Sequence, residues 1–169
     1  MTRAPRGGGS DPAAPRKASK RGAARLAAVQ ALYQMDITGA GLNDILAQFE
    51  SHWLGREVEG EHYLPAEHDF FRDIVTGVVG VQRDLDPRID RVLEATWPLK
   101  RIEAVLRSVL RAGAWELSAR ADIPARVVVS EYVDVAHAFV DLTETGMINA
   151  VLERLARDTR GAEFDRSPG

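Results

Sequence analysis

IEAVLRSVLRAGAWEL, residues 102–117, carries the strongest helical period in the sequence. Its apolar and small residues recur at spacings of three and four, so they line one face of an α-helix. They are Ile102, Val105, Leu106, Val109, Leu110, Gly113 and Leu117. Because so continuous an apolar stripe must pack against other elements, we predict that this segment is a central core helix.

The segments on either side also read as helices. Before the central helix we expect helices up to residue 37, over 42–53 and over 67–83, and a short one opened by Asp86-Pro87, a helix-start signal. After it we expect helices over 125–140, despite the β-branched run at 127–129, and from Asp141 to residue 158. No segment reads as a convincing strand. The predicted fold class is all-α, with about seven helices.

The turn expected at residues 84–87 divides these helices into two small bundles that share a core. We therefore assign an N-terminal helical subdomain to residues 20–83 and a C-terminal one to residues 84–158. Residues 1–19 are rich in Gly, Pro, Ala, Arg and Ser, a composition typical of a disordered extension, here a basic one. Residues 159–169 are expected to form a disordered tail.

A basic stripe precedes the first apolar helix, in the segment 17–35, KASKRGAARLAAVQALYQM. Lys17, Arg21 and Arg25 step by four, so they share one face if the helix extends that far back, and Lys20 adjoins them. Tyr33 lies two turns beyond Arg25 on roughly that side. A basic stripe beside an aromatic ring is a platform for RNA phosphates and unstacked bases. A solvated basic tail with an aromatic core residue is the alternative interpretation.

The net charge of −3 conceals an asymmetry along the chain. Up to Arg25 there are seven basic residues and one acid, so this part carries +6 and the remainder carries −9. An acidic body with a basic arm indicates a polyanion site at the arm and not over the whole surface.

The sequence offers no constellation for catalysis. There is no cysteine, no H-E-x-x-H metal motif, no phosphate-binding glycine loop and no G-x-S-x-G motif. Glu116 and Glu131 could be paired catalytic carboxylates, but a structural ion pair with an arginine such as Arg111, or a helix cap, is favoured. We expect no enzyme activity, no catalytic residue, no metal site and no cofactor. Without a membrane-spanning run or a signal peptide, we expect a cytoplasmic protein.

Several motifs resemble the bacterial transcription antitermination factor NusB family. RLAAVQALY at 25–33 is similar to the family's first helix, FRDIVTGV at 71–78 to its third, and VLRAGAWEL at 109–117 to its central helix. Ile123-Pro124, Glu131, Phe139 and INAVL at 148–152 are similar to its C-terminal half. The resemblance covers about residues 20–156, with the motifs in order.

The resemblance implies an all-α fold of two helical bundles that binds the boxA element of nascent RNA. It also implies a complex with the ribosomal small-subunit protein that doubles as NusE, and with other Nus factors and RNA polymerase. The family's arginine-rich start corresponds to Lys20, Arg21 and Arg25, its RNA-contacting tyrosine to Tyr33, and a further aromatic residue to Phe139.

The chain departs from the family pattern at several positions. Gly22 and Ala23 stand where some members carry arginine, Leu106 replaces a partner-facing acidic residue, and Thr143 replaces an acidic residue near the RNA face. A helical protein–protein adaptor without RNA binding therefore stays an alternative, as does a NusB-like RNA-binding domain related to those of rRNA methyltransferases. Because relatives occur as monomers and dimers, the sequence leaves a homodimer open.

Overall fold

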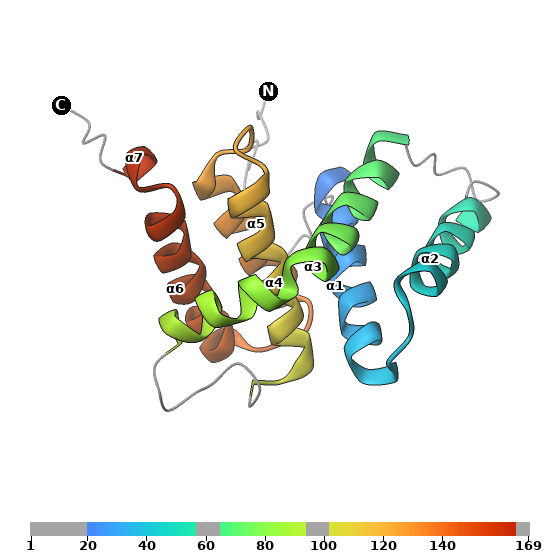
Figure 1. The fold of residues 1–169 in the computed structure, drawn as a ribbon, viewed down its shortest axis with the longest axis horizontal. Helices are drawn as coiled ribbons and strands as arrows, with labels where there is room; N and C mark the ends of the chain where they lie inside the picture. Colours follow the sequence, from blue (N-terminus) through green and yellow to red (C-terminus); the bar gives the residue numbers. More distant parts are fainter. Residues whose placement is uncertain (1–19, 57–64, 94–101, 165–169) are drawn as a thin grey trace, which may run out of the picture.

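The computed structural model describes residues 20–56, 65–93 and 102–164, and within these ranges the protein has seven helices and no strand (Figure 1). The helices are α1 (Lys20–Thr38), α2 (Leu42–Arg56), α3 (Pro65–Val92), α4 (Ala104–Ala119), α5 (Ala125–His137), α6 (Leu142–Thr159) and α7 (Gly161–Phe164). The predicted all-α fold class is therefore confirmed.

Helix α4 is the central core helix that its period predicts. It packs against four other helices, α1, α3, α5 and α6. Leu106, Val109, Leu110 and Leu117 are buried on it, and Gly113 allows α6 to approach closely. A Cβ added at Gly113 would lie 2.7 Å from a methyl carbon of Leu152, so a larger residue here would force the Leu152 side chain to shift.

Helix α1 lies on α3 and α4 through a face made largely of alanine. Ala24, Ala28 and Ala31 are buried there, and small side chains allow α1 to lie close to its neighbours. Gly39 ends the helix with a φ of +73°, a left-handed conformation that favours glycine.

Helix α3 runs through the turn that the sequence predicts at residues 84–87, so that prediction is wrong. The apolar stripe continues past Pro87 with Leu85, Ile89 and Leu93 all buried, and this burial offsets the cost of proline inside a helix. Figure 1 shows the helix bending between its green and yellow-green parts, as expected where Pro87 removes a backbone N–H. The division into two subdomains at this point stays a prediction.

Asp86 does not cap a helix, because its carboxylate is used elsewhere. Arg111 of α4 donates to both of its oxygens, from Nε to Oδ1 and from Nη2 to Oδ2, each at 2.9 Å. Asp86, which the sequence predicts as the cap of a new helix, instead joins α3 to α4.

The C-terminal part is more ordered than the sequence predicts. Asp141 caps α6 as expected, and its Oδ1 accepts from the backbone N–H of Thr143 at 3.2 Å and of Glu144 at 3.4 Å. The expected disordered tail at 159–169 is wrong for its first residues, since α7 follows α6 after Arg160. Residues 165–169, like the predicted basic extension 1–19, lie outside the described residues.

None of the helices in the described ranges is both long and apolar enough to cross a membrane.

We predict that Gly77→Ala destabilises the fold by about 1–3 kcal/mol, because a Cβ at this position of α3 would overlap the indole ring of Trp115 on α4. The matched control is Gly80→Ala on the same helix, where no atom lies within 4 Å of an added Cβ. That change should be neutral or stabilising by up to about 1 kcal/mol. Urea unfolding of the two variants measures the difference, and equal stabilities would contradict the packing described here.

Candidate nucleic-acid interface

Arg21, the second residue of α1, presents the exposed cation of the described basic arm. Its guanidinium carbon lies 5.5 Å from the centre of the Phe70 ring, and no carboxylate of the described residues lies within 4.0 Å of its nitrogens. The ring therefore supports the guanidinium without neutralising it. Arg21 is free to pair with a phosphate.

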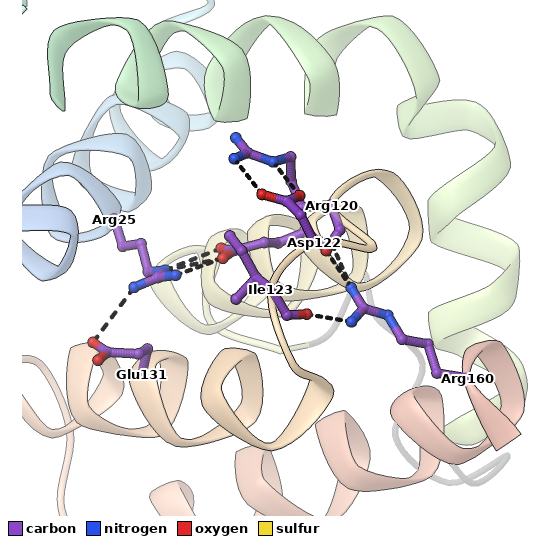
Figure 2. A network of polar contacts seen from close by, with 7 residues as sticks. Arg25, Arg120, Asp122, Ile123, Glu131 and Arg160 are labelled. Carbon is purple, nitrogen blue, oxygen red and sulfur yellow. Dashed lines mark hydrogen bonds and ion pairs between the residues drawn. The ribbon is translucent and has the colours of Figure 1, made fainter. Parts of the chain in front are cut away.

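Arg25 lies one turn further on and is buried, with 2% of its side chain exposed. Its Nε donates to both oxygens of Glu116, at 3.2 and 3.1 Å, and its Nη2 donates to Oε1 at 2.6 Å. Glu131 of α5 lies 3.6 Å from Nη1 on the other side (Figure 2). The predicted role of Arg25 as a phosphate contact does not fit this position, because two carboxylates already occupy its nitrogens.

The two glutamates that could have been a catalytic pair instead form a structural ion cluster. The sequence predicts an ion pair with an arginine such as Arg111. The arginine that pairs with these glutamates is Arg25 of α1, whereas Arg111 pairs with Asp86. Glu116 is fully buried, so its charge depends on Arg25 for compensation. The cluster joins α1 to α4 and α5.

Two residues of this region, Arg25 and Tyr132, have pKa values that keep their protonation constant. Burial alone would lower the pKa of Arg25, but the hydrogen bonds and the negative charge of Glu116 outweigh it and raise that pKa. Burial, together with the charge of Glu116, holds the pKa of the neighbouring Tyr132 well above its usual range. Tyr132 therefore stays neutral and the arginine stays charged over the whole physiological pH range.

The loop between α4 and α5 lies beside the basic end of α1. Arg120 donates to both oxygens of Asp122, each at 3.0 Å, and these hydrogen bonds lower the pKa of Asp122 to about 2. Asp122 is therefore ionised at neutral pH, and its charge also acts on Arg21. A hollow of about 400 Å³ opens here, lined by Arg21 and Arg25, by residues 122–124 of the loop, and by α5.

Arg160 holds this loop against the end of α4, a role that the sequence does not predict. Its Nε donates to the carbonyl of Leu117 at 2.8 Å and its Nη2 to that of Arg120 at 2.7 Å. A further hydrogen bond from Nη1 reaches the carbonyl of Ile123 (Figure 2). One side chain thus satisfies carbonyls that the end of α4 leaves without helical partners. In the sequence, the position of Arg160 just after an amphipathic helix is only a weak indication of this role.

The two predicted aromatic residues are both accessible. Tyr33 is 38% exposed on α1, two turns beyond Arg25, and Phe139 is 37% exposed just after the end of α5. Arg25 joins these same two helices through its contact with Glu131. The aromatic rings therefore lie on α1 and just after α5, the two helices that the contact between Arg25 and Glu131 joins.

The remaining predicted site residue is Lys20, the first residue of α1. Its side chain lies outside the part of the chain that the structure describes. Among the described residues no group of three His, Asp or Glu side chains gathers as a metal site.

Comparisons with known proteins agree on one family. The model of the NusB family matches residues 22–157. The transcription antitermination protein NusB of Bradyrhizobium sp. strain ORS 278 is 73% identical over 149 residues, which cover 88% of this chain and 89% of the relative. The protein of the same name from Rhodopseudomonas palustris strain HaA2 is 68% identical over 155 residues, 92% of each chain. These names are those of transcription factors, which agrees with the prediction that the chain is not an enzyme.

Solved structures show the same fold. A structure of T. maritima NusB is 27% identical and has a TM-score of 0.72, covering 86% of this chain and 96% of that one. A chain in the crystal structure of the antitermination factors NusB and NusE in complex with dsRNA has a TM-score of 0.66 at 22% identity, covering 82% of this chain and 97% of that one.

We predict that Glu116→Gln lowers the free energy of unfolding by about 3 kcal/mol, because it leaves the buried charge of Arg25 with only the more distant Glu131. Glu131→Gln is the matched control and should cost less than about 1 kcal/mol, since Glu131 is 30% exposed and its contact is longer.

The double variant Arg25→Met with Glu116→Leu should recover most of that loss, because it removes both buried charges and keeps the volume similar. Urea unfolding followed by circular dichroism measures all four proteins. Equal losses in Glu116→Gln and Glu131→Gln would contradict the role assigned to the buried pair.

Proposed function

The chain belongs to the NusB family, and we propose that it is a transcription antitermination factor that binds boxA-like single-stranded RNA together with a NusE-type ribosomal protein. One observation carries the proposal. Arg21, an exposed arginine that meets no carboxylate of the described residues, and Tyr33, an exposed aromatic ring, lie on one helix that the buried Arg25 joins to the body.

The basic residues divide into two roles in this proposal. Arg21 and Lys20, at the start of α1, contact phosphates and supply the salt-dependent part of the affinity. Arg25 does not contact the RNA in this proposal. It supports the site indirectly, because its ion pairs with Glu116 and Glu131 hold α1 against the body. A phosphate contact requires an accessible cation, and Arg21 is the described arginine of α1 that meets this condition.

The aromatic residues favour single-stranded RNA over duplex RNA in this proposal. Tyr33 and Phe139 each expose more than a third of their surface, enough for a base to stack on the ring. Stacking of this kind requires bases that are not already paired in a duplex, so it favours single-stranded RNA.

The proposed partners follow the relatives. The curated relatives are named transcription antitermination proteins, and a chain of the same fold has been crystallised with NusE and dsRNA. From the resemblance to the family, we also propose that this chain joins other Nus factors on RNA polymerase. We propose that the complex with the NusE-type protein binds RNA better than this chain alone. RNA should then tighten the binding of that protein by the same factor, because coupling between two sites is reciprocal.

A helical adaptor that does not bind RNA is the second candidate, and the burial of Arg25 favours it. With Gly22 and Ala23 at positions where some members have arginine, Arg21 is left as the accessible arginine among the described residues of α1. Retention of RNA at low and at moderate salt separates the two candidates, because an adaptor should retain none.

We predict that Arg21→Ala weakens binding of a boxA-like RNA and reduces the salt slope of log K by about 0.7, the value for one phosphate contact on a single strand. Arg83→Ala is the matched control, since Arg83 is an exposed arginine of α3 remote in sequence from this site. Fluorescence anisotropy across a salt series measures both slopes, and an equal decrease in the two variants would overturn the assignment.

We also predict that Tyr33→Ala weakens binding of single-stranded RNA by about 1–3 kcal/mol, whereas Tyr33→Phe retains most of the affinity because the ring still stacks. A duplex of the same sequence should respond little to either change. The NusE-type protein should tighten the binding of wild-type protein to the single strand. If neither RNA binds to folded protein, with or without this partner, the adaptor becomes the better description.

A further inference from the structure

A groove of about 550 Å³ lies between the last turns of α3 and the second half of α6. Arg88 and Arg91 line it from α3, and Arg154, Asp158 and Thr159 line it from α6. In Figure 1 the yellow-green end of α3 crosses α6, and the hydrogen bond from Arg88 Nη2 to Thr159 Oγ1 at 3.3 Å shows that the two helices meet there. Among the described residues, three guanidinium groups thus share the groove with one carboxylate, that of Asp158.

Arg88 is held in place by neutral partners. Its Nη2 donates to the hydroxyl of Ser118 at 3.1 Å as well as to Thr159, and no carboxylate of the described residues lies within 4.0 Å of its nitrogens. A hydroxyl fixes a guanidinium without cancelling its charge. Because Arg88 is partly buried, this uncompensated charge costs free energy that a bound anion would recover.

The other two arginines are available at the rim of the groove. Arg91 is exposed and, within the described part of the chain, has no carboxylate within 4.0 Å. Arg154 pairs with Asp158 at 3.4 Å, but both side chains are more than half exposed, so this ion pair is weak. A doubly charged anion can replace Asp158 as the partner of Arg154 at little cost.

We propose that this groove binds phosphate groups, with Arg88 as the fixed donor and Arg91 and Arg154 as mobile donors that close on the anion. Arginine suits this role because its planar fork donates two parallel hydrogen bonds to phosphate oxygens. The groove is formed by α3 and α6, whereas Arg21 lies on α1, so this site is separate from the RNA platform and does not depend on it. The phosphates come either from the backbone of an RNA or from a small phosphorylated molecule.

Tripolyphosphate is a suitable first probe because it carries phosphate oxygens without a base. Titrated into ¹⁵N-labelled protein, it should shift the amide resonances of Arg88, Arg91, Arg154 and Thr159 in a saturable manner. The double variant Arg91→Glu with Arg154→Glu should weaken this binding by about tenfold or more. Both side chains are exposed, so the fold should be retained, and thermal unfolding checks this.

The matched control is Arg83→Glu, which makes the same kind of charge change on α3 outside the groove. It should leave the affinity for tripolyphosphate nearly unchanged. No saturable shifts at the groove, or an equal loss in the control and in the double variant, would overturn the proposal.

Short and long single-stranded RNAs then distinguish the two sources of phosphate. If the RNA backbone occupies the groove, the double variant should reduce the salt slope for the long RNA by about 1.4, that is, two contacts of 0.7 each. If the slope is unchanged while tripolyphosphate still binds, the natural ligand is a small phosphorylated molecule. Arg21→Ala, measured in parallel, tests the α1 platform alone, so failure of one site is not mistaken for failure of the other.

Discussion

The buried ion pair between Arg25 and Glu116 is the interaction on which the arrangement of the N-terminal helix depends. The face that α1 packs on the body is made largely of alanine, which buries little area per residue and gives little directional preference. A guanidinium that donates three hydrogen bonds to one carboxylate has a much narrower range of acceptable positions. Our interpretation is that the pair fixes the position of α1 on α4 and α5, at the cost of burying two charges.

That constraint also determines which basic residues remain for a ligand. Arg21 and Arg25 are one turn apart, yet one is exposed and the other is enclosed by two carboxylates. Both guanidinium groups, and that of Arg120, lie within 5.5 Å of the centre of the Phe70 ring. The negative faces of this ring, with Asp122 and Glu116 nearby, allow three cations to gather. Because Glu116 and Glu131 balance the charge of Arg25, the positive charge that can attract a ligand lies on Arg21, nearer the start of α1.

Local periodicity predicts the helices well, because an amphipathic stripe follows from the geometry of a single helix. Helices α1, α4 and α6 follow from it directly. The errors arise where a tertiary partner overrides a local signal. Asp86-Pro87 reads as a helix start until Arg111 of α4 is seen to occupy the carboxylate. Residues after Asp158 read as a disordered tail until Arg160 is found to bind the carbonyls at the end of α4. In neither case does the neighbouring sequence reveal the partner.

The same limit applies to the arginines, whose roles depend on what each nitrogen contacts. A spacing of four places Arg21 and Arg25 on one face, but it cannot tell whether another helix covers part of that face. The group that each guanidinium contacts distinguishes a structural arginine from one that can bind a ligand. An arginine bound to a buried carboxylate, as Arg25 is, has its charge satisfied within the fold and serves the structure. An arginine that is held by hydroxyls and meets no carboxylate of the described residues, such as Arg88, has a defined position and an uncompensated charge. An anion site requires a cation whose charge is not already balanced, so we propose that Arg88 and Arg21, and not Arg25, are the arginines that contact phosphate.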